Sequence, residues 1–165
     1  MDFLLIIVLT LLNGAFAMSE LALTASRKVR LQTMAEAGDK GAKAALALMD
    51  NPTQFLSSVQ VGITSIGMLN GIVGEAAFSD KLAAWLQSTI TLSDRVAEIS
   101  ATAIVVTVIT FITILFGELV PKRIGQLYPE TVARVVALPM TWVATGAKPF
   151  VRLLSMCTHG MLKLL

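Results

Sequence analysis

Gly117, Glu118 and Pro121 lie close together in the stretch FGELVPKR, which follows an uncharged apolar run. In a helix, Pro121 has no N–H to donate to the carbonyl of Gly117 four residues earlier, so that oxygen is available to another partner. Gly117 has no side chain to shield its backbone, and Glu118 adds a carboxylate. A free carbonyl beside a carboxylate is typical of a cation site.

Three further side chains with oxygen atoms could complete such a site. Asn13 lies in the first apolar segment, and Thr64 and Asn70 lie in the second. Oxygen atoms of these kinds are the ligands of a hard cation such as Mg²⁺. We therefore predict a metal site formed by Asn13, Thr64, Asn70, Gly117 and Glu118. The alternative is that Glu118 only ends the helix and pairs with Lys122 one turn later.

The composition places these residues in a membrane protein. Of the 165 residues, 55% are hydrophobic and only 15% are charged, which is too apolar for an ordinary soluble domain of this length. The net charge of +2 is small and the cations are dispersed, so nucleic acid is not an expected partner. Cys157 is the single cysteine, and the single histidine, His159, has no second ligand at metal-binding spacing.

Three apolar segments are long enough to cross a lipid bilayer: residues 3–25, 53–74 and 99–120. The first contains Ala-Phe-Ala at 15–17, which imitates a signal-peptide cleavage site. Its cations follow the apolar run instead of preceding it, so we interpret it as a transmembrane helix.

The charges between the spans predict which side of the membrane each loop faces. Residues 27–50 carry five Lys or Arg in a helical alternation with apolar residues, which predicts a cytoplasmic amphipathic hairpin that turns near Gly38 and Gly41. The connection at 75–98 has more acids than cations and suits the outer face. The positive-inside rule then places the N-terminus outside and the C-terminus in the cytoplasm.

The last segment, residues 128–165, is apolar but interrupted by cations, prolines and glycine. No window of about twenty residues is free of them, so we expect a broken helix along the inner interface and not a fourth span. The predicted fold is an all-α membrane protein with three transmembrane helices, a cytoplasmic amphipathic helical hairpin and a C-terminal interfacial belt helix.

Each predicted span has one face of small and polar residues. On the second span, for example, Gln60, Thr64, Gly67 and Gly71 recur at three- and four-residue steps. Such faces either let helices pack closely or line a polar cavity between them.

Three stretches follow one another along the chain: NGAFAMSELAL at 13–23, QVGIT at 60–64 and FGELVPK at 116–122. Together they resemble the transmembrane (DUF21) domain of the CNNM/CorC family. The resemblance covers nearly the whole chain. It implies a homodimer of three-span protomers in the bacterial inner membrane that works in efflux of Mg²⁺, and in some members Co²⁺, thought to be driven by Na⁺. The family normally continues into a cytoplasmic CBS pair and a CorC/HlyC domain. We therefore interpret these residues as the membrane domain of a longer protein.

Carried over to this sequence, the family's cation site corresponds best to Asn13, Gly117 and Glu118. Ala17 stands where some members have a second hydroxyl, so one potential ligand oxygen is missing.

The substrate has an alternative. Three other stretches are ASRK at 25–28, GIVGEAAFS at 71–79 and PKRIG at 121–125. They resemble the polyamine-exporter branch of the same family, and this branch is linked to putrescine and cadaverine. A carboxylate neutralises a diamine as readily as a metal ion.

An alternative hypothesis assigns no transport to the domain. In this hypothesis the domain is a dimeric membrane anchor and sensor scaffold for CBS domains. An enzyme is not expected, because the sequence has no H-E-x-x-H motif, no G-x-S-x-G motif and no paired Asp within the spans.

Overall fold

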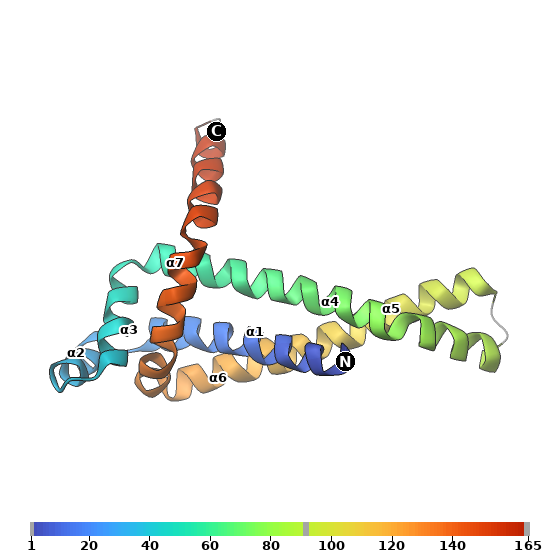
Figure 1. Cartoon of the computed structure of the whole chain (residues 1–165), viewed down its shortest axis with the longest axis horizontal. Coiled ribbons are helices and arrows are strands. Elements are labelled where there is room, and N and C mark those ends of the chain that lie inside the picture. Colours follow the sequence, from blue (N-terminus) through green and yellow to red (C-terminus); the bar gives the residue numbers. More distant parts are fainter. Residues whose placement is uncertain (1, 91–92, 164–165) are drawn as a thin grey trace. The chain divides into compact units, whose positions relative to one another are not determined.

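The computed structural model describes residues 2–90 and 93–163, which form helices and no strands (Figure 1). Residues 91–92 of the predicted outer connection and residues 164–165 of the predicted interfacial segment lie outside the described residues. Within the described part, the expected all-α class is confirmed.

Three helices are long and apolar enough to cross a membrane: Asp2–Ala25, Pro52–Ile90 and Asp94–Leu127. The first two are α1 and α4. The third is built from α5 (Asp94–Ile114), a π-helical segment η1 (Leu115–Leu119) and α6 (Val120–Leu127). Helices suit a bilayer because they satisfy their backbone hydrogen bonds internally. Over the residues that the structure describes, the chain is thus an all-helical membrane protein with three such helices.

The second helix is longer than the predicted span at 53–74. Helix α4 continues to Ile90 and α5 begins at Asp94, so most of the predicted connection at 75–98 is helical. Residues 75–90 contain no proline or glycine, and their charges interrupt the apolar run without interrupting the helix. The two helices run side by side (Figure 1) and pack through the buried residues Ala83, Leu86, Ala97 and Ala101.

The chain forms two compact units. The first unit comprises Met1–Ala15 and Ile63–Pro121, and the second comprises Phe16–Gly62 and Lys122–Leu165. The first unit has a buried apolar cluster of Ile6, Val105 and Ile109, against which Val73, Phe78 and Leu82 pack.

The second unit contains the hairpin of α2 (Lys28–Glu36) and α3 (Lys40–Asp50). The chain turns at Gly38, whose φ of 96° is a conformation that glycine adopts without strain. Asp39 then caps α3 by accepting a hydrogen bond from the Ala42 N–H at 3.0 Å. Gly41, which was also expected near the turn, instead lies inside α3, where its backbone meets the carbonyl of Arg134 in α7.

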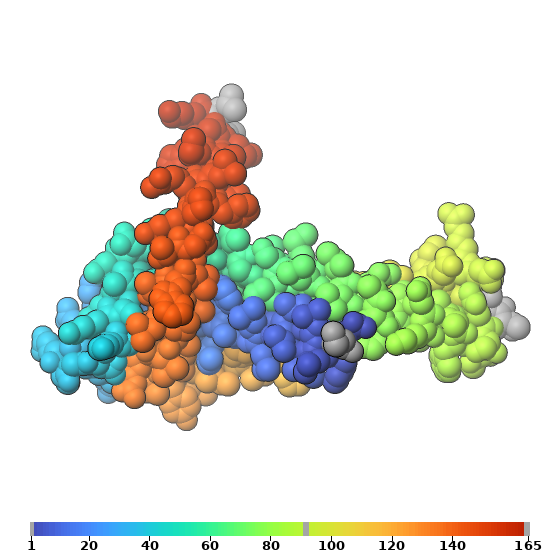
Figure 2. All heavy atoms as spheres, in the orientation of Figure 1, coloured from blue at the N-terminus to red at the C-terminus, as the bar shows by residue number. Residues whose placement is uncertain are grey.

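The last helix, α7 (Pro129–Leu162), contains Pro139 and Pro149 but is continuous. The expectation of a broken helix was therefore wrong. Each proline removes one hydrogen bond, and the neighbouring residues keep theirs, so the helix continues past both. Residues 152–163 are all exposed. In Figure 2 they belong to the red atoms near the C-terminus.

Candidate functional site

The Gly117 carbonyl, on which the prediction of a cation site was based, already has a hydrogen-bond donor in Asn13. In the first unit, Asn13 Nδ2 donates a hydrogen bond to the Gly117 carbonyl oxygen at 3.0 Å. Both residues are buried. The oxygen that Pro121 cannot satisfy in an α-helix thus has a donor from α1, and a cation would have to share or displace that donor.

Asn70 joins three helices in the same unit. It is 0% exposed, and its Nδ2 donates to the hydroxyl of Thr10 on α1 at 2.8 Å and to that of Thr113 on α5 at 2.9 Å. Amide-to-hydroxyl bonds of this kind hold membrane helices together where apolar packing alone gives little specificity. Asn70 therefore fixes the position of α4 against α1 and α5.

Two oxygen atoms of this network lack a partner. The Oδ1 atoms of Asn13 and Asn70 are buried and have no hydrogen bond to any described residue. Buried carbonyl-type oxygens are rarely left unpaired, because each has lost its hydration without compensation. Such oxygens attract water, a hydrogen-bond donor or a cation.

A small cavity of about 180 Å³ lies beside the network in the first unit. Its lining is made by Asn13, Ile63, Gly67, Gly71, Ile109, Thr110, Thr113, Ile114 and Glu118. Gly67 and Gly71 keep the space open, since a Cβ at either position would have no neighbour within 4 Å. Glu118 is the acidic member of the lining.

The π-helical segment η1 carries Gly117 and Glu118. Its hydrogen bonding is shown by the N–H of Val120, which donates to the carbonyl of Leu115 five residues earlier. A π turn contains an extra residue and is frequent at functional sites. Pro121 follows directly and packs on Gly14, where a Cβ would lie 2.9 Å from Pro121 Cγ.

The structure brings together most of the predicted ligands. Asn13 and Glu118 line the cavity, Gly117 is bonded to Asn13, and Asn70 is bonded to the lining residue Thr113. Thr64 is exposed and does not line the cavity. Among the described residues no three His, Cys, Asp or Glu side chains come together, so a cation in this cavity would be held largely by neutral oxygens.

Sequence reasoning missed Thr113 and the partner of Glu20. Thr113 lies three residues after Thr110 and four before Gly117, so the helical spacing of small and polar residues is the signal that could have found it. In the second unit, Glu20 lies 3.5 Å from Lys122 Nζ, and both side chains are largely buried. A carboxylate within an apolar span is itself a signal of a partner, but spacing along the chain does not identify Lys122 as that partner.

Comparison with known proteins agrees with the fold and with the expected family. The family model described as the cyclin M (CNNM) transmembrane N-terminal domain matches residues 4–165. A UPF0053 protein of Synechocystis is 42% identical over 99% of this chain and 36% of its own length.

Relatives whose names state a function are also similar. The polyamine export protein of Escherichia coli is 35% identical over 90% of this chain and 33% of its own length. That of Salmonella typhimurium is 33% identical over 97% of this chain and 35% of its own length. The chain thus spans about a third of the length of these curated relatives. From the family match over nearly all of its residues, this chain belongs to the cyclin M (CNNM) family, in the part that forms the transmembrane N-terminal domain.

Proposed function

We propose that this chain is the membrane domain of a cation exporter, that the cavity of the first unit is its transit site, and that Mg²⁺ is its cargo. The observation that supports this proposal is that Asn13, whose Oδ1 is buried and unpartnered, lines a cavity together with Glu118. The second unpartnered oxygen, Asn70 Oδ1, belongs to the hydrogen-bond network that reaches the cavity at Thr113. An acidic side chain within a membrane span is costly in lipid, and such groups face a bundle interior or a water-filled cavity and mark ion pathways.

The donor set suits a hydrated metal ion. Mg²⁺ gives up its water reluctantly and is usually bound through one or two carboxylates with several waters retained. A cavity of about 180 Å³ has room for an ion with part of its hydration shell. Glu118 would neutralise one of the two positive charges, and amide and hydroxyl oxygens would orient the retained waters. Co²⁺ would use the same oxygens, and Na⁺ competing for them would couple its entry to metal export.

A diamine such as putrescine is the second candidate cargo. Two of the relatives are named polyamine export proteins. An ammonium group donates three hydrogen bonds, which a carboxylate and the unpartnered amide oxygens would accept. A site with a single acidic lining residue is adequate for one ammonium group.

The surroundings of the domain are part of the proposal. The hairpin of α2 and α3 faces the cytoplasm, the N-terminus lies outside, and the protein works as a homodimer in the bacterial inner membrane. A cytoplasmic CBS pair of the longer protein would act on the domain from the hairpin side. The competing function, a dimeric anchor and sensor scaffold for that CBS pair, would use the Asn70 network for assembly and would bind no cargo.

Isothermal titration of the purified domain with Mg²⁺, Co²⁺ and putrescine tests these functions. Glu118→Gln is the test variant, and Glu98→Gln is the matched control because it removes one exposed carboxylate from α5 away from the cavity. Saturable Mg²⁺ binding that is lost only in Glu118→Gln supports the proposal. Putrescine binding alone supports the diamine. If none of the three cations binds while the protein stays dimeric, the scaffold is the better function.

A further inference from the structure

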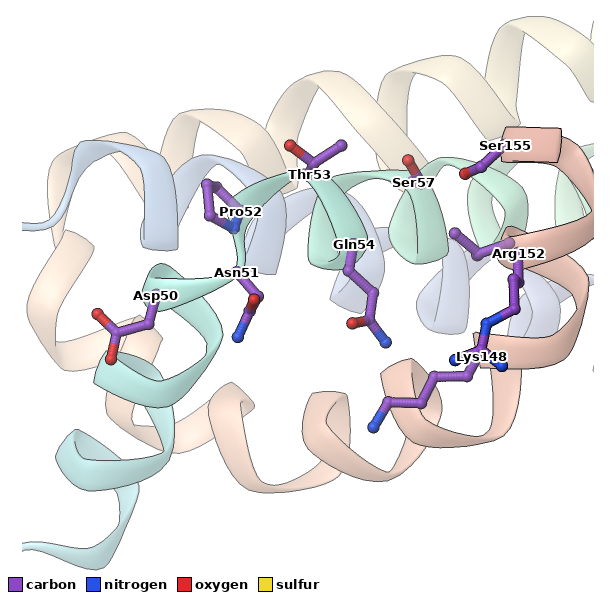
Figure 3. Close-up of a pocket in the computed structure, with 10 residues that line it drawn as sticks. Asp50, Asn51, Pro52, Thr53, Gln54, Ser57, Lys148, Arg152 and Ser155 are labelled. Atoms are coloured by element: carbon purple, nitrogen blue, oxygen red, sulfur yellow. The ribbon is translucent and has the colours of Figure 1, made fainter. Parts of the chain in front are cut away.

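The second unit has a larger polar cavity that the proposed function does not use. It has a volume of about 520 Å³ and lies between the start of α4 and the second half of α7 (Figure 3). Among the side chains drawn in Figure 3, Lys148 and Arg152 come from α7, and Asn51 and Gln54 come from the opposite wall. We call it the basic cavity, after Lys148 and Arg152, and its lining residues all belong to the second unit.

Lys148 and Arg152 make the cavity electropositive. They are four residues apart on α7, so they project from the same face of the helix and repel each other. Neither forms an ion pair with any described carboxylate. Two neighbouring cations without an acidic partner favour an anion between them.

The opposite wall contributes hydrogen-bond donors and little negative charge. Figure 3 shows the Gln54 side chain pointing from α4 towards the space in front of the two cations. The first N–H groups of α4, at Thr53 and Gln54, have no partner within the helix, so they also present donors. Asp50 is the one acidic lining residue, and its carboxylate is paired with Lys28 at 2.9 Å.

The elements around the cavity indicate the source of the anion. Helix α4 is a candidate membrane span, so its first turn at Pro52 belongs near one membrane surface. The part of α7 that carries the cations also exposes Phe150, Leu153 and Leu154. A helix with exposed apolar residues beside basic ones is typical of a segment at the surface of an anionic membrane.

We propose that this basic cavity binds a phosphate group, held by Lys148 and Arg152 against the first turn of α4. The headgroup of an anionic phospholipid is the source that the surrounding apolar side chains favour. Inorganic phosphate from solution would present the same chemistry. The proposal is independent of the cargo, because the cavity lies in the second unit and shares no lining residue with the transit site.

The test compares two variants that remove the same charge. Lys148→Gln/Arg152→Gln removes the cations of the cavity, and Lys40→Gln/Lys43→Gln removes two exposed cations of α3 in the same unit. Native mass spectrometry measures how much phosphatidylglycerol and phosphatidylcholine each protein retains from an equal mixture. Titration with inorganic phosphate in lipid-free neutral detergent forms the second arm.

We expect phosphatidylglycerol retention to fall roughly thirtyfold in the cavity variant, since each basic residue near an anionic surface contributes about fivefold. The α3 variant should retain the lipid like the wild type. Loss of phosphate binding in detergent, again only in the cavity variant, would identify free phosphate as the ligand. Equal behaviour of the two variants in both arms would overturn the proposal. Should the double variant fail to fold, Arg152→Gln alone provides the same comparison with a roughly fivefold loss.

Discussion

Gly41→Ala should separate α3 from α7. A Cβ at this position would lie 1.9 Å from the carbonyl oxygen of Arg134 and 2.8 Å from its carbonyl carbon. Carbon and oxygen atoms approach to about 3.3 Å, so the helices would have to move apart by about 1.4 Å at this point. The obstacle is backbone and cannot rotate away. Ala42 and Ala45 on α3 are fully buried, and they would lose packing contacts if α3 moved away from α7.

The expected cost follows from these distances. Overpacking of a close contact costs about 3 kcal/mol when the neighbour cannot give way, and the helix propensity of alanine offsets about 1 kcal/mol. A net loss of about 2 kcal/mol lowers the melting temperature of a chain of this length by about 4–8 °C. Gly71→Ala is the matched control, because a Cβ there has no neighbour within 4 Å and should be neutral or stabilising.

Thermal unfolding in detergent, followed by circular dichroism, measures both variants under one condition. Hydrogen exchange would locate the loss in the second unit, at α3 and the adjoining part of α7. The reasoning is refuted if Gly41→Ala melts at or above the temperature of Gly71→Ala.

Three further predictions concern the polar groups of both units. Asn70→Leu removes two buried hydrogen bonds and should lower unfolding stability by about 1–3 kcal/mol, whereas Thr107→Val, at an exposed hydroxyl, should have little effect in the same thermal assay. Gly67→Ala adds a methyl group to the cavity and should weaken putrescine binding by about fivefold in titration, and Mg²⁺ binding less. An equal effect on both cations would contradict the size argument. Glu20→Gln breaks the ion pair with Lys122 and should cost about 1 kcal/mol in chemical unfolding, while no change would show that the pair contributes nothing.

The helical class and the first span were predictable because they follow from hydropathy. The span expected at 3–25 coincides closely with α1, Asp2–Ala25. The extent of α4 was not predictable in this way, because residues 75–90 are amphipathic and form a helix through their propensity and their packing on α5. Hydropathy detects the part of a helix that is apolar all round and misses an amphipathic continuation.

The part of the candidate site that depends on neighbouring residues in the sequence was predictable. Gly117 and Glu118 were identified because a proline follows them at a spacing that disturbs an α-helix. The bonds that Asn70 forms with Thr10 and Thr113 depend on how three helices meet, which spacing within one helix cannot show. The π turn adds to the difficulty, because it shifts the face that a regular 3.6-residue period assigns to the residues after it.

The π-helical segment makes the length of residues 115–119 matter more than their composition. Deleting one residue there would restore an α-helical turn and remove the extra backbone group, so Gly117 and Glu118 could no longer both keep their places, one bonded to Asn13 and the other in the cavity lining. Exchanging one exposed apolar side chain of the segment for another would leave the backbone of Gly117 in place. Related sequences should therefore vary freely at the exposed positions Phe116 and Leu119 while tolerating neither insertion nor deletion between Ile114 and Pro121.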